Sequence, residues 1–182
     1  MHQCEVLVKV YSDHIQEVRM CSKPFTTGIR RAQADDKASV MTILVGTKFF
    51  RPEELRVAEE VFDDALACGP DGDYQSFVAG DAHKIVGWIC FGPTPCAAGT
   101  FDIYWLVVEP ESQNAGVGTS LVQYATAHIK DCNGRLIVVD TSGSPRYLPT
   151  RQFYEKLGYS REACIKDFYL VGDDKIIYVK RI

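Results

Sequence analysis

A glycine-bearing loop at residues 113–118 is the part of this sequence whose residue types best suit binding chemistry. An apolar, β-branched run precedes the loop, and apolar residues recur every four positions after it, as on one face of a helix. A loop that opens a helix leaves several backbone N–H groups unpaired at the positive end of the helix dipole. Phosphate is the natural ligand of that arrangement, so the loop predicts a phosphate site. Its residues are Gln113, Asn114, Ala115, Gly116, Val117 and Gly118.

Three known kinds of phosphate loop can be compared with this one. A P-loop requires Gly-x-x-x-x-Gly-Lys followed by Ser or Thr, and the chain contains no such run. A Rossmann loop requires Gly-x-Gly-x-x-Gly directly after a strand, but Leu121 stands at the third position and residues 109–115 intervene. In the third kind, Gln or Arg precedes x-x-Gly-x-Gly/Ala, and Gln113, Gly116 and Gly118 match it in order. The loop thus resembles the pyrophosphate loop of the GNAT acetyltransferase superfamily. The alternative is that the two glycines only make the start of the helix more flexible and that no ligand binds there.

A second stretch, residues 151–159, resembles the other signature of that superfamily. It reads Arg-Gln-Phe-Tyr-Glu-Lys-Leu-Gly-Tyr, with a Phe-Tyr pair on a short predicted helix before Lys-x-Gly-Tyr. The two signatures stand in the family's order, and the resemblance covers about residues 25–182. It implies an acetyl-CoA-dependent N-acetyltransferase in which a primary amine attacks the thioester directly in a ternary complex, without a metal. Residues 1–24 form an extension of unknown role, and residues 167–178 look like a bacterial and archaeal subfamily whose acceptors are mostly unassigned.

The resemblance also implies where acetyl-CoA would lie. In GNAT enzymes it lies between the fourth and fifth strands, which splay after a bulge, and its pantetheine arm pairs with exposed strand backbone. The loop amides would hold the pyrophosphate, and glycine is needed there because a Cβ would hold the phosphates away from the backbone. Thr141 and Ser142, at the end of the next strand, would hydrogen-bond a pantetheine amide, although relatives often carry Asn there. The strand residues that would face the arm are Leu106, Val107 and Val108.

Acyl transfer to an amine makes three demands on the protein. The ammonium must lose a proton, the oxyanion must be stabilised, and the departing thiolate benefits from an acid. Tyr154 matches the family tyrosine that stands near the thioester sulfur and can protonate the thiolate. The alternative is a core aromatic residue whose hydroxyl merely bonds a neighbour. A strand amide near Val108 is the candidate that would stabilise the oxyanion.

Asp102 is the candidate base. It stands five residues before Val107, where several relatives carry a carboxylate that deprotonates the acceptor through water. Its apolar neighbours Phe101, Ile103 and Trp105 predict a raised pKa, which suits a base near neutral pH. The alternative to the role of base is that Asp102 binds the cationic acceptor or caps a loop, and the sequence favours neither.

The acceptor site is predicted from the family's last hairpin and from the connection between the first two helices. Asp167, on the hairpin, would reach the acceptor or belong to a solvated turn. Phe50 would form the opposite wall, and Tyr104 shares the face of Asp102 because it lies two residues further along the strand. Acidic and aromatic residues together favour a small cationic amine. A protein N-terminus or lysine as acceptor, a longer acyl donor, and a CoA-binding sensor without turnover remain open.

The periodicity predicts an α/β protein with the element order of the GNAT fold, β-α-α-β-β-β-α-β-α-β-β. The expected architecture is a mixed, mostly antiparallel sheet of about seven strands, with a parallel splay of the fourth and fifth strands and helices on both faces. Helices are predicted at 36–47, 52–68, 117–132 and 149–157. Strands are predicted at 25–34, 74–80, 85–91, 100–108, 135–140, 159–169 and 175–180.

Length and composition limit the number of domains, the kinds of partner and the location of the protein. The 182 residues suit one domain, and 20 basic against 24 acidic residues give a net charge of −4, which offers no electrostatic support for binding nucleic acid. No apolar run approaches the ~20 residues of a membrane span, and the N-terminus lacks a secretory pattern. The seven cysteines include no Cys-x-x-Cys and keep no metal-ligand spacing with the histidines. We therefore expect a cytoplasmic protein with reduced thiols and no metal, and a homodimer is possible.

Overall fold

A seven-stranded sheet forms the centre of the computed structural model, which describes residues 28–81 and 84–182. The strand order is β1-β2-β3-β4-β5-β7-β6, and neighbours are antiparallel except for β4 and β5, which run parallel. The strands are β1 (Gly28–Arg31), β2 (Gln75–Gly80), β3 (Ile85–Pro93), β4 (Thr100–Val108), β5 (Leu136–Ser142), β6 (Ser160–Leu170) and β7 (Asp173–Arg181). The α-helices are α1 (Lys37–Gly46), α2 (Pro52–Cys68), α3 (Val117–Asp131) and α4 (Leu148–Lys156).

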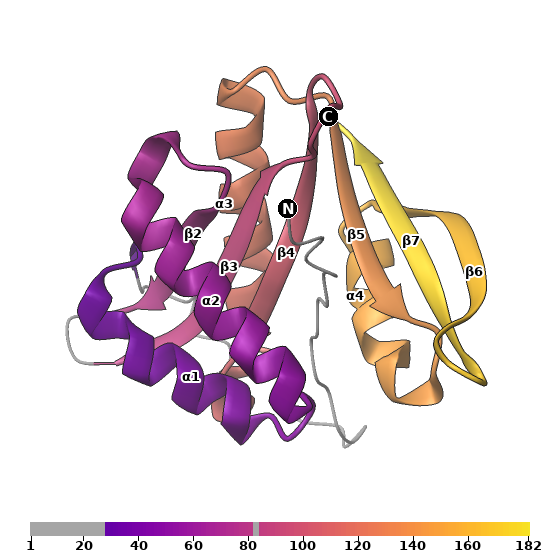
Figure 1. Cartoon of the computed structure of the whole chain (residues 1–182), viewed down its shortest axis with the longest axis horizontal. Helices are drawn as coiled ribbons and strands as arrows, with labels where there is room; N and C mark the ends of the chain where they lie inside the picture. The colour runs from indigo at the N-terminus through magenta and orange to yellow at the C-terminus, as the bar shows by residue number, and fades with distance from the viewer. Residues whose placement is uncertain (1–27, 82–83) are drawn as a thin grey trace.

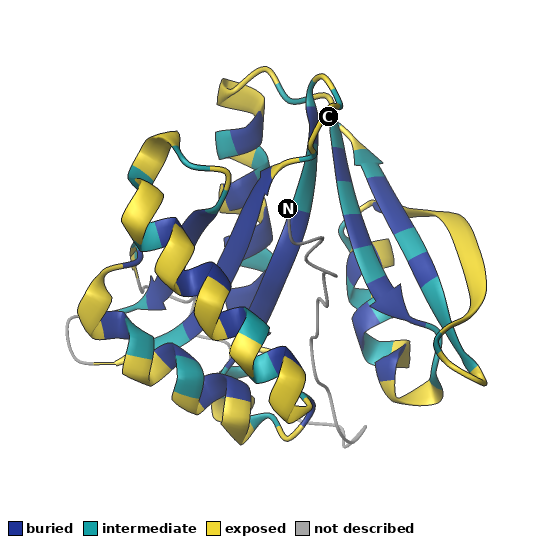
Figure 2. Cartoon of the chain, viewed as in Figure 1, coloured by how far each residue is buried: buried dark blue, intermediate teal, exposed yellow. Residues whose placement is uncertain are grey.

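Helices cover both faces of the sheet (Figure 1). Helices α1 and α2 pack over β2, β3 and β4 and bury a cluster that includes Phe62, Trp88 and Trp105. Helices α3 and α4 lie on the opposite face, over a core that includes Leu121 and Ile137. Figure 2 shows β3 and β4 buried along most of their length, whereas β6 at the sheet edge is exposed. Burial on both faces explains why the sequences of β3 and β4 are almost continuously apolar.

Strands β4 and β5 diverge along their length. They pair only at the start of β4, where the last partners are Asp102 and Val138. Just beyond, β4 bulges: Cys90 on β3 faces Trp105 and Phe91 faces Ile103, which leaves Tyr104 as the extra residue. A bulge bends the strand that carries it, which accounts for the divergence. We call the space between residues 103–108 and 139–142 the wedge.

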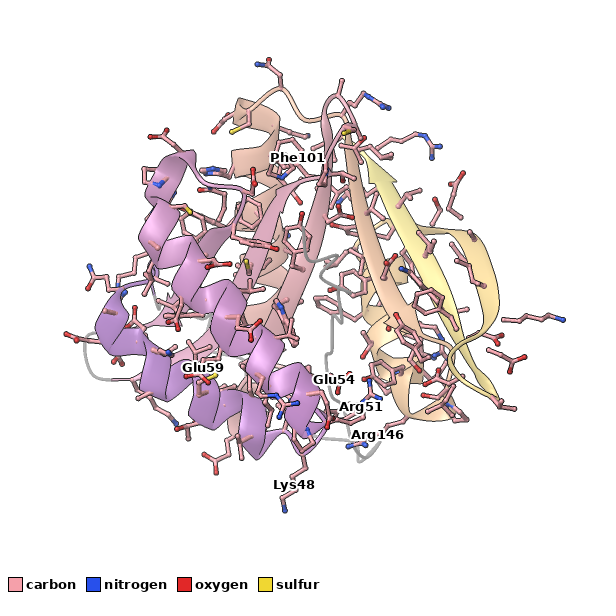
Figure 3. All side chains as sticks on the ribbon, in the orientation of Figure 1. Lys48, Arg51, Glu54, Glu59, Phe101 and Arg146 are labelled. Carbon is pink, nitrogen blue, oxygen red and sulfur yellow. The ribbon has the colours of Figure 1, made fainter. Side chains whose placement is uncertain are left out.

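The connection between α1 and α2 is held by a helix cap. Pro52 occupies the first turn of α2, where its missing N–H costs no hydrogen bond. The carboxylate of Glu54 reaches back and accepts a hydrogen bond from the backbone N–H of Arg51 at 2.7 Å. In Figure 3 Arg51 and Glu54 lie at this end of α2, on the side towards Arg146. The guanidinium of Arg146 stacks 3.8 Å from the centre of the Phe49 ring, so this connection is tied to the segment between β5 and α4.

The predicted fold class and element order are confirmed by the sheet order and the parallel pairing of β4 with β5. Three strands run longer than predicted: β3 continues to Pro93, β5 continues to Ser142, and β7 extends from Asp173 to Arg181. The predicted strand at 25–34 is represented by β1, and the extension at 1–24 lies outside the described residues. In the part of the chain that is described, no helix is both long and apolar enough to span a bilayer.

Candidate active site

The predicted phosphate loop borders a pocket of about 250 Å³ between the start of α3 and α4. Gly116 has a φ of 86°, in the left-handed region that glycine adopts without steric cost. A Cβ on Gly116 would meet no atom within 4 Å, so it would project into open space. Ala115 is exposed and does not line the pocket. The pocket wall includes Gln113, Asn114, Gly116, Val117 and Gly118 from the loop, and Gln152, Phe153 and Lys156 from α4.

The backbone of β4 presents hydrogen-bonding groups to the wedge. The N–H of Glu109 donates to the carbonyl of Val86 on β3 at 2.8 Å. Because these groups alternate along a strand, the N–H and C=O of Val108 and Leu106 point away from β3, towards the wedge. The carbonyl of Val108 accepts a hydrogen bond from Nε2 of Gln113 at 3.4 Å, which ties the loop to the strand. The side chains of Leu106 and Val108 are buried, so any ligand in the wedge would meet their backbone. The backbone groups of Val107, also predicted to face the ligand, point instead to Trp88 on β3.

Tyr154, on α4, lies in the core on the face of the sheet that α3 and α4 cover. It is fully buried, in the cluster that also contains Val108 of β4 and Val139 of β5. Its hydroxyl has no hydrogen-bond partner among the described residues. Burial raises the pKa of Tyr154 well above that of a free phenol, with a smaller contribution from Tyr159. The phenol is therefore neutral and keeps a proton that it can donate.

Thr141 and Ser142 differ in what they can offer a ligand. The hydroxyl of Thr141 is buried and unpartnered within the described part of the chain. The hydroxyl of Ser142 already bonds the carboxylate of Asp173 and the hydroxyl of Ser144, and its carbonyl accepts from Arg151 at 2.7 Å. Of the two predicted residues, Thr141 is the one whose side chain is available for a ligand.

Asp102 is held by a direct contact that sequence reasoning missed. The hydroxyl of Thr94, in the loop between β3 and β4, donates to Oδ2 of Asp102 at 2.6 Å. Burial raises the pKa of the Asp102 carboxyl, and the Thr94 hydrogen bond partly opposes that shift. The nearby Asp140 carboxylate raises the pKa further, whereas Lys175 lowers it. The net direction is upwards, as the apolar sequence neighbours predict.

The ion pair between Asp140 and Lys175 was also missed. The two side chains are each only 16% exposed, and the ammonium of Lys175 lies 4.7 Å over the ring of Phe168. Burial raises the pKa of Asp140, and Lys175 opposes that shift. Sequence signals could have drawn attention to the two residues, although not to their contact. Asp140 ends an otherwise apolar run, and Lys175 is the first residue of the last predicted strand.

The two predicted aromatic acceptor residues lie on the face that α1 and α2 cover. Phe50 is half-buried and packs against Trp105, with ring centres 5.4 Å apart. Tyr104 is only 8% exposed; its hydroxyl donates to the carbonyl of Pro93, and its ring meets Tyr74 edge-on. Burial also raises the pKa of Tyr104. Tyr104 is therefore part of the packing around the β4 bulge, and Phe50 is the more accessible of the two.

Asp167 stabilises its own hairpin. It has a φ of 53°, and its carboxylate accepts from the N–H of Gly172 at 2.6 Å. Its N–H donates to the carboxylate of Asp174 at 3.0 Å. No hydrogen bond or ion pair within the described residues joins Asp167 to Asp102 or Asp140. These contacts fit the solvated-turn interpretation.

Comparison with known proteins identifies the family. The acetyltransferase (GNAT) domain profile matches residues 72–161, and no curated protein sequence matches the chain. A GNAT-family structure from Desulfovibrio desulfuricans is 39% identical, covers 86% of this chain and 99% of its own, and superposes with a TM-score of 0.82.

More distant structures share the fold. An aminoglycoside 6'-N-acetyltransferase complexed with coenzyme A is 19% identical and covers 84% of this chain and 96% of its own, with a TM-score of 0.66. The ribosomal-protein-S18-alanine N-acetyltransferase from Escherichia coli is 15% identical and covers 86% of this chain and 94% of its own, with a TM-score of 0.67. The domain profile and the 39% identity to the Desulfovibrio protein, over nearly the whole length of that protein, show that this chain belongs to the GNAT family of N-acetyltransferases.

Proposed function

We propose that this protein transfers an acetyl group from acetyl-CoA to a primary amine by direct attack in a ternary complex. The observation that carries the proposal is a pocket bordered by a left-handed glycine, joined to a stretch of β4 backbone that β5 leaves unpaired. A diphosphate suits the amides at the helix start, and an amide-bearing arm suits the unpaired strand edge. The family and a CoA-bound structural neighbour support acetyl-CoA as the donor.

The residues of the site fit acetyl-CoA on three counts. The position of Gly116 leaves the front of the loop open, and Lys156 lines the same pocket with a positive charge. The unpartnered hydroxyls of Thr141 and Tyr154 are buried polar groups of the kind that a ligand satisfies. Acetyl-CoA supplies an acetyl thioester. Gln113 would fix the loop against β4, while the loop amides hold the diphosphate.

The proton transfers can be assigned to groups of the chain. The Asp102 carboxylate takes a proton from the acceptor ammonium, directly or through water, so that the neutral amine can attack. The Val108 N–H faces the wedge and stabilises the negative charge that develops on the carbonyl oxygen. Tyr154 gives its phenolic proton to the departing sulfur. The ammonium loses two protons in all: Asp102 takes the first before the attack, and the second leaves the nitrogen as the tetrahedral intermediate collapses. One of the two replaces, through solvent, the proton that Tyr154 gives to the thiolate, and the other is released to solvent when Asp102 returns to its ionised form.

The acceptor is proposed as a small-molecule or peptide amine. Two carboxylates, Asp102 and Asp140, face one ammonium, that of Lys175, so the local charge favours a cation. We also propose that residues 25–182 form the catalytic domain and that 1–24 is an extension. A homodimer stays a prediction, which sedimentation of the full chain would test.

Two measurements on the full chain test the proposed function. Acetyl-CoA and CoA should raise the melting temperature in a saturable manner, because a ligand that binds the native state stabilises it. CoA release should then depend on an amine from a panel of small amines, peptides with free N-termini and lysine peptides. Binding without release with any amine would support a CoA sensor instead. Absence of a thermal shift at millimolar CoA would contradict both.

Gly116→Ala is expected to weaken acetyl-CoA binding about tenfold, because its methyl group would stand where a phosphate meets the backbone. Gly172→Ala is the matched control. Both glycines have a φ of 86°, and a Cβ on either meets nothing within 4 Å, so the backbone strain is the same. Both variants should lose similar stability in thermal melts. Calorimetry with acetyl-CoA should show weakened binding for Gly116→Ala alone, and equal affinities would place the diphosphate elsewhere.

A further inference from the structure

Four side chains from different parts of the chain gather on one face of the sheet. Asp102 pairs with Val138 across the parallel β4–β5 ladder, so Asp140, two residues further along β5, lies on the same face as Asp102. On β7, Lys175 pairs with Ser142 and is therefore the diagonal neighbour of Asp140. Thr94 completes the group from the loop between β3 and β4. This face is opposite the one that α3 and α4 cover.

Thr94 fixes Asp102 at one oxygen. Its hydroxyl donates to Oδ2, which leaves Oδ1 without a hydrogen bond from the described residues. The loop that carries Thr94 is itself braced, because the Thr94 N–H donates to the carbonyl of Thr100 at 2.9 Å. A carboxylate held at one oxygen presents the other in a constant direction, which proton transfer requires.

Asp140 forms an ion pair with the nearby ammonium of Lys175. Lys175 is close enough to influence both carboxylates, yet its ammonium pairs with Asp140. A flexible four-carbon stem would let Lys175 turn to Asp102 if Asp140 were neutral. Paired with Lys175, Asp102 would be a weaker base and would no longer face the substrate. Asp140 thus keeps Asp102 free.

We propose that Thr94 and Asp140 are positioning residues for Asp102: Thr94 orients its carboxylate, and Asp140 sequesters the Lys175 ammonium that would otherwise neutralise it. The catalytic consequence rests on the proposed function. The groups that face Asp102 are Thr94 from the β3–β4 loop, Asp140 from β5, Lys175 from β7 and Tyr104 from β4 itself.

The test is an NMR titration of the Asp102 side-chain carboxyl in the full chain and its variants. Thr94→Val removes a donor to the carboxylate, so the pKa of Asp102 should rise above the wild-type value. Asp140→Asn should lower it for two reasons: the carboxylate that raises the Asp102 pKa is lost, and the freed ammonium moves to Asp102. The double variant Asp140→Asn/Lys175→Met should return it towards wild type, and Thr94→Ser should behave like wild type. Lys175→Met should raise the Asp102 pKa more in the Asp140→Asn background than in the wild-type background, because only there does the ammonium reach Asp102. An ammonium that stays in place predicts the same rise in both backgrounds, which would contradict the sequestering role.

Kinetics provide a second measurement. The acid limb of the kcat/KM profile should move to higher pH in Thr94→Val and to lower pH in Asp140→Asn. kcat should fall about tenfold in each, and the double variant should recover to within about threefold. Unchanged titrations in Thr94→Val and Asp140→Asn, or a double variant that stays as low as Asp140→Asn, would overturn the proposal. The titration does not depend on turnover, so it still decides the positioning role if the proposed acetyl transfer fails.

Discussion

Tyr154→Phe is expected to lower kcat about 100-fold while the KM for acetyl-CoA stays within about twofold of wild type. The substitution removes only a hydroxyl that has no partner among the described residues, so no hydrogen bond is broken in the core. Because burial raises the pKa of Tyr154, the phenol remains protonated through the working pH range and can act as the acid. Steady-state kinetics with the best amine from the panel would measure the effect, and a circular dichroism melt should show an unchanged or slightly raised Tm.

Tyr159→Phe is the control for this experiment. Tyr159 is also a buried tyrosine, and its ring centre lies 5.2 Å from that of Tyr154. Removal of its hydroxyl changes the same core without touching the proposed acid. A similar loss of kcat in both variants would mean that packing or stability is responsible. Full activity in Tyr154→Phe would show that Tyr154 is not the acid and that water protonates the thiolate.

The predictable parts of the site are those formed by residues that lie close together in the sequence. The loop at 113–118 and the helix that carries Tyr154 follow from spacing within about ten residues, because a helix start and an apolar stripe are local features. The left-handed Gly116 is of the same kind, since only glycine occupies that backbone region without strain. The element order follows from the same periodicities.

What the sequence could not supply is strand register. Asp140 shares a face with Asp102 only because Asp102 pairs with Val138; a slip of one residue would turn Asp140 to the α4 side. Lys175 reaches Asp140 through a second register, between β5 and β7. Neither pairing is encoded in a local pattern. The residues around Asp102 therefore could not be predicted from the sequence, although its burial could.

The two weaker acceptor predictions depend on local backbone that periodicity does not describe. The bulge at Tyr104 packs this residue beside Tyr74 and Pro93, where its hydroxyl already has a partner. At Asp167 the left-handed backbone directs the carboxylate to Gly172 within the same turn. Both side chains are therefore occupied by contacts within the fold. Carboxylates on the sheet face, not those in the turn, are the better candidates for recognising a cation.

Asp102→Asn is expected to lower kcat/KM about 100-fold near neutral pH. The carboxylate is the active form of a base, so wild-type activity should rise with pH through the raised pKa of Asp102 and then level off. An amide accepts no proton at these pH values. The variant must use amine that is already neutral in solution, so its rate should keep rising with pH towards the pKa of the free acceptor. The pH profiles of kcat/KM for the two proteins measure this difference.

Two features make this variant a sharp test. The side-chain oxygen of Asn can still accept the Thr94 hydroxyl, so the loop between β3 and β4 should stay in place and the fold should survive. Asp167→Asn serves as the control, because Asp167 carries the other carboxylate predicted to reach the acceptor but is engaged in its own turn. Its pH profile should match wild type. If Asp102→Asn keeps the wild-type profile while Asp167→Asn loses it, the base lies on the last hairpin. If only Asp102→Asn changes, the carboxylate on β4 removes the proton.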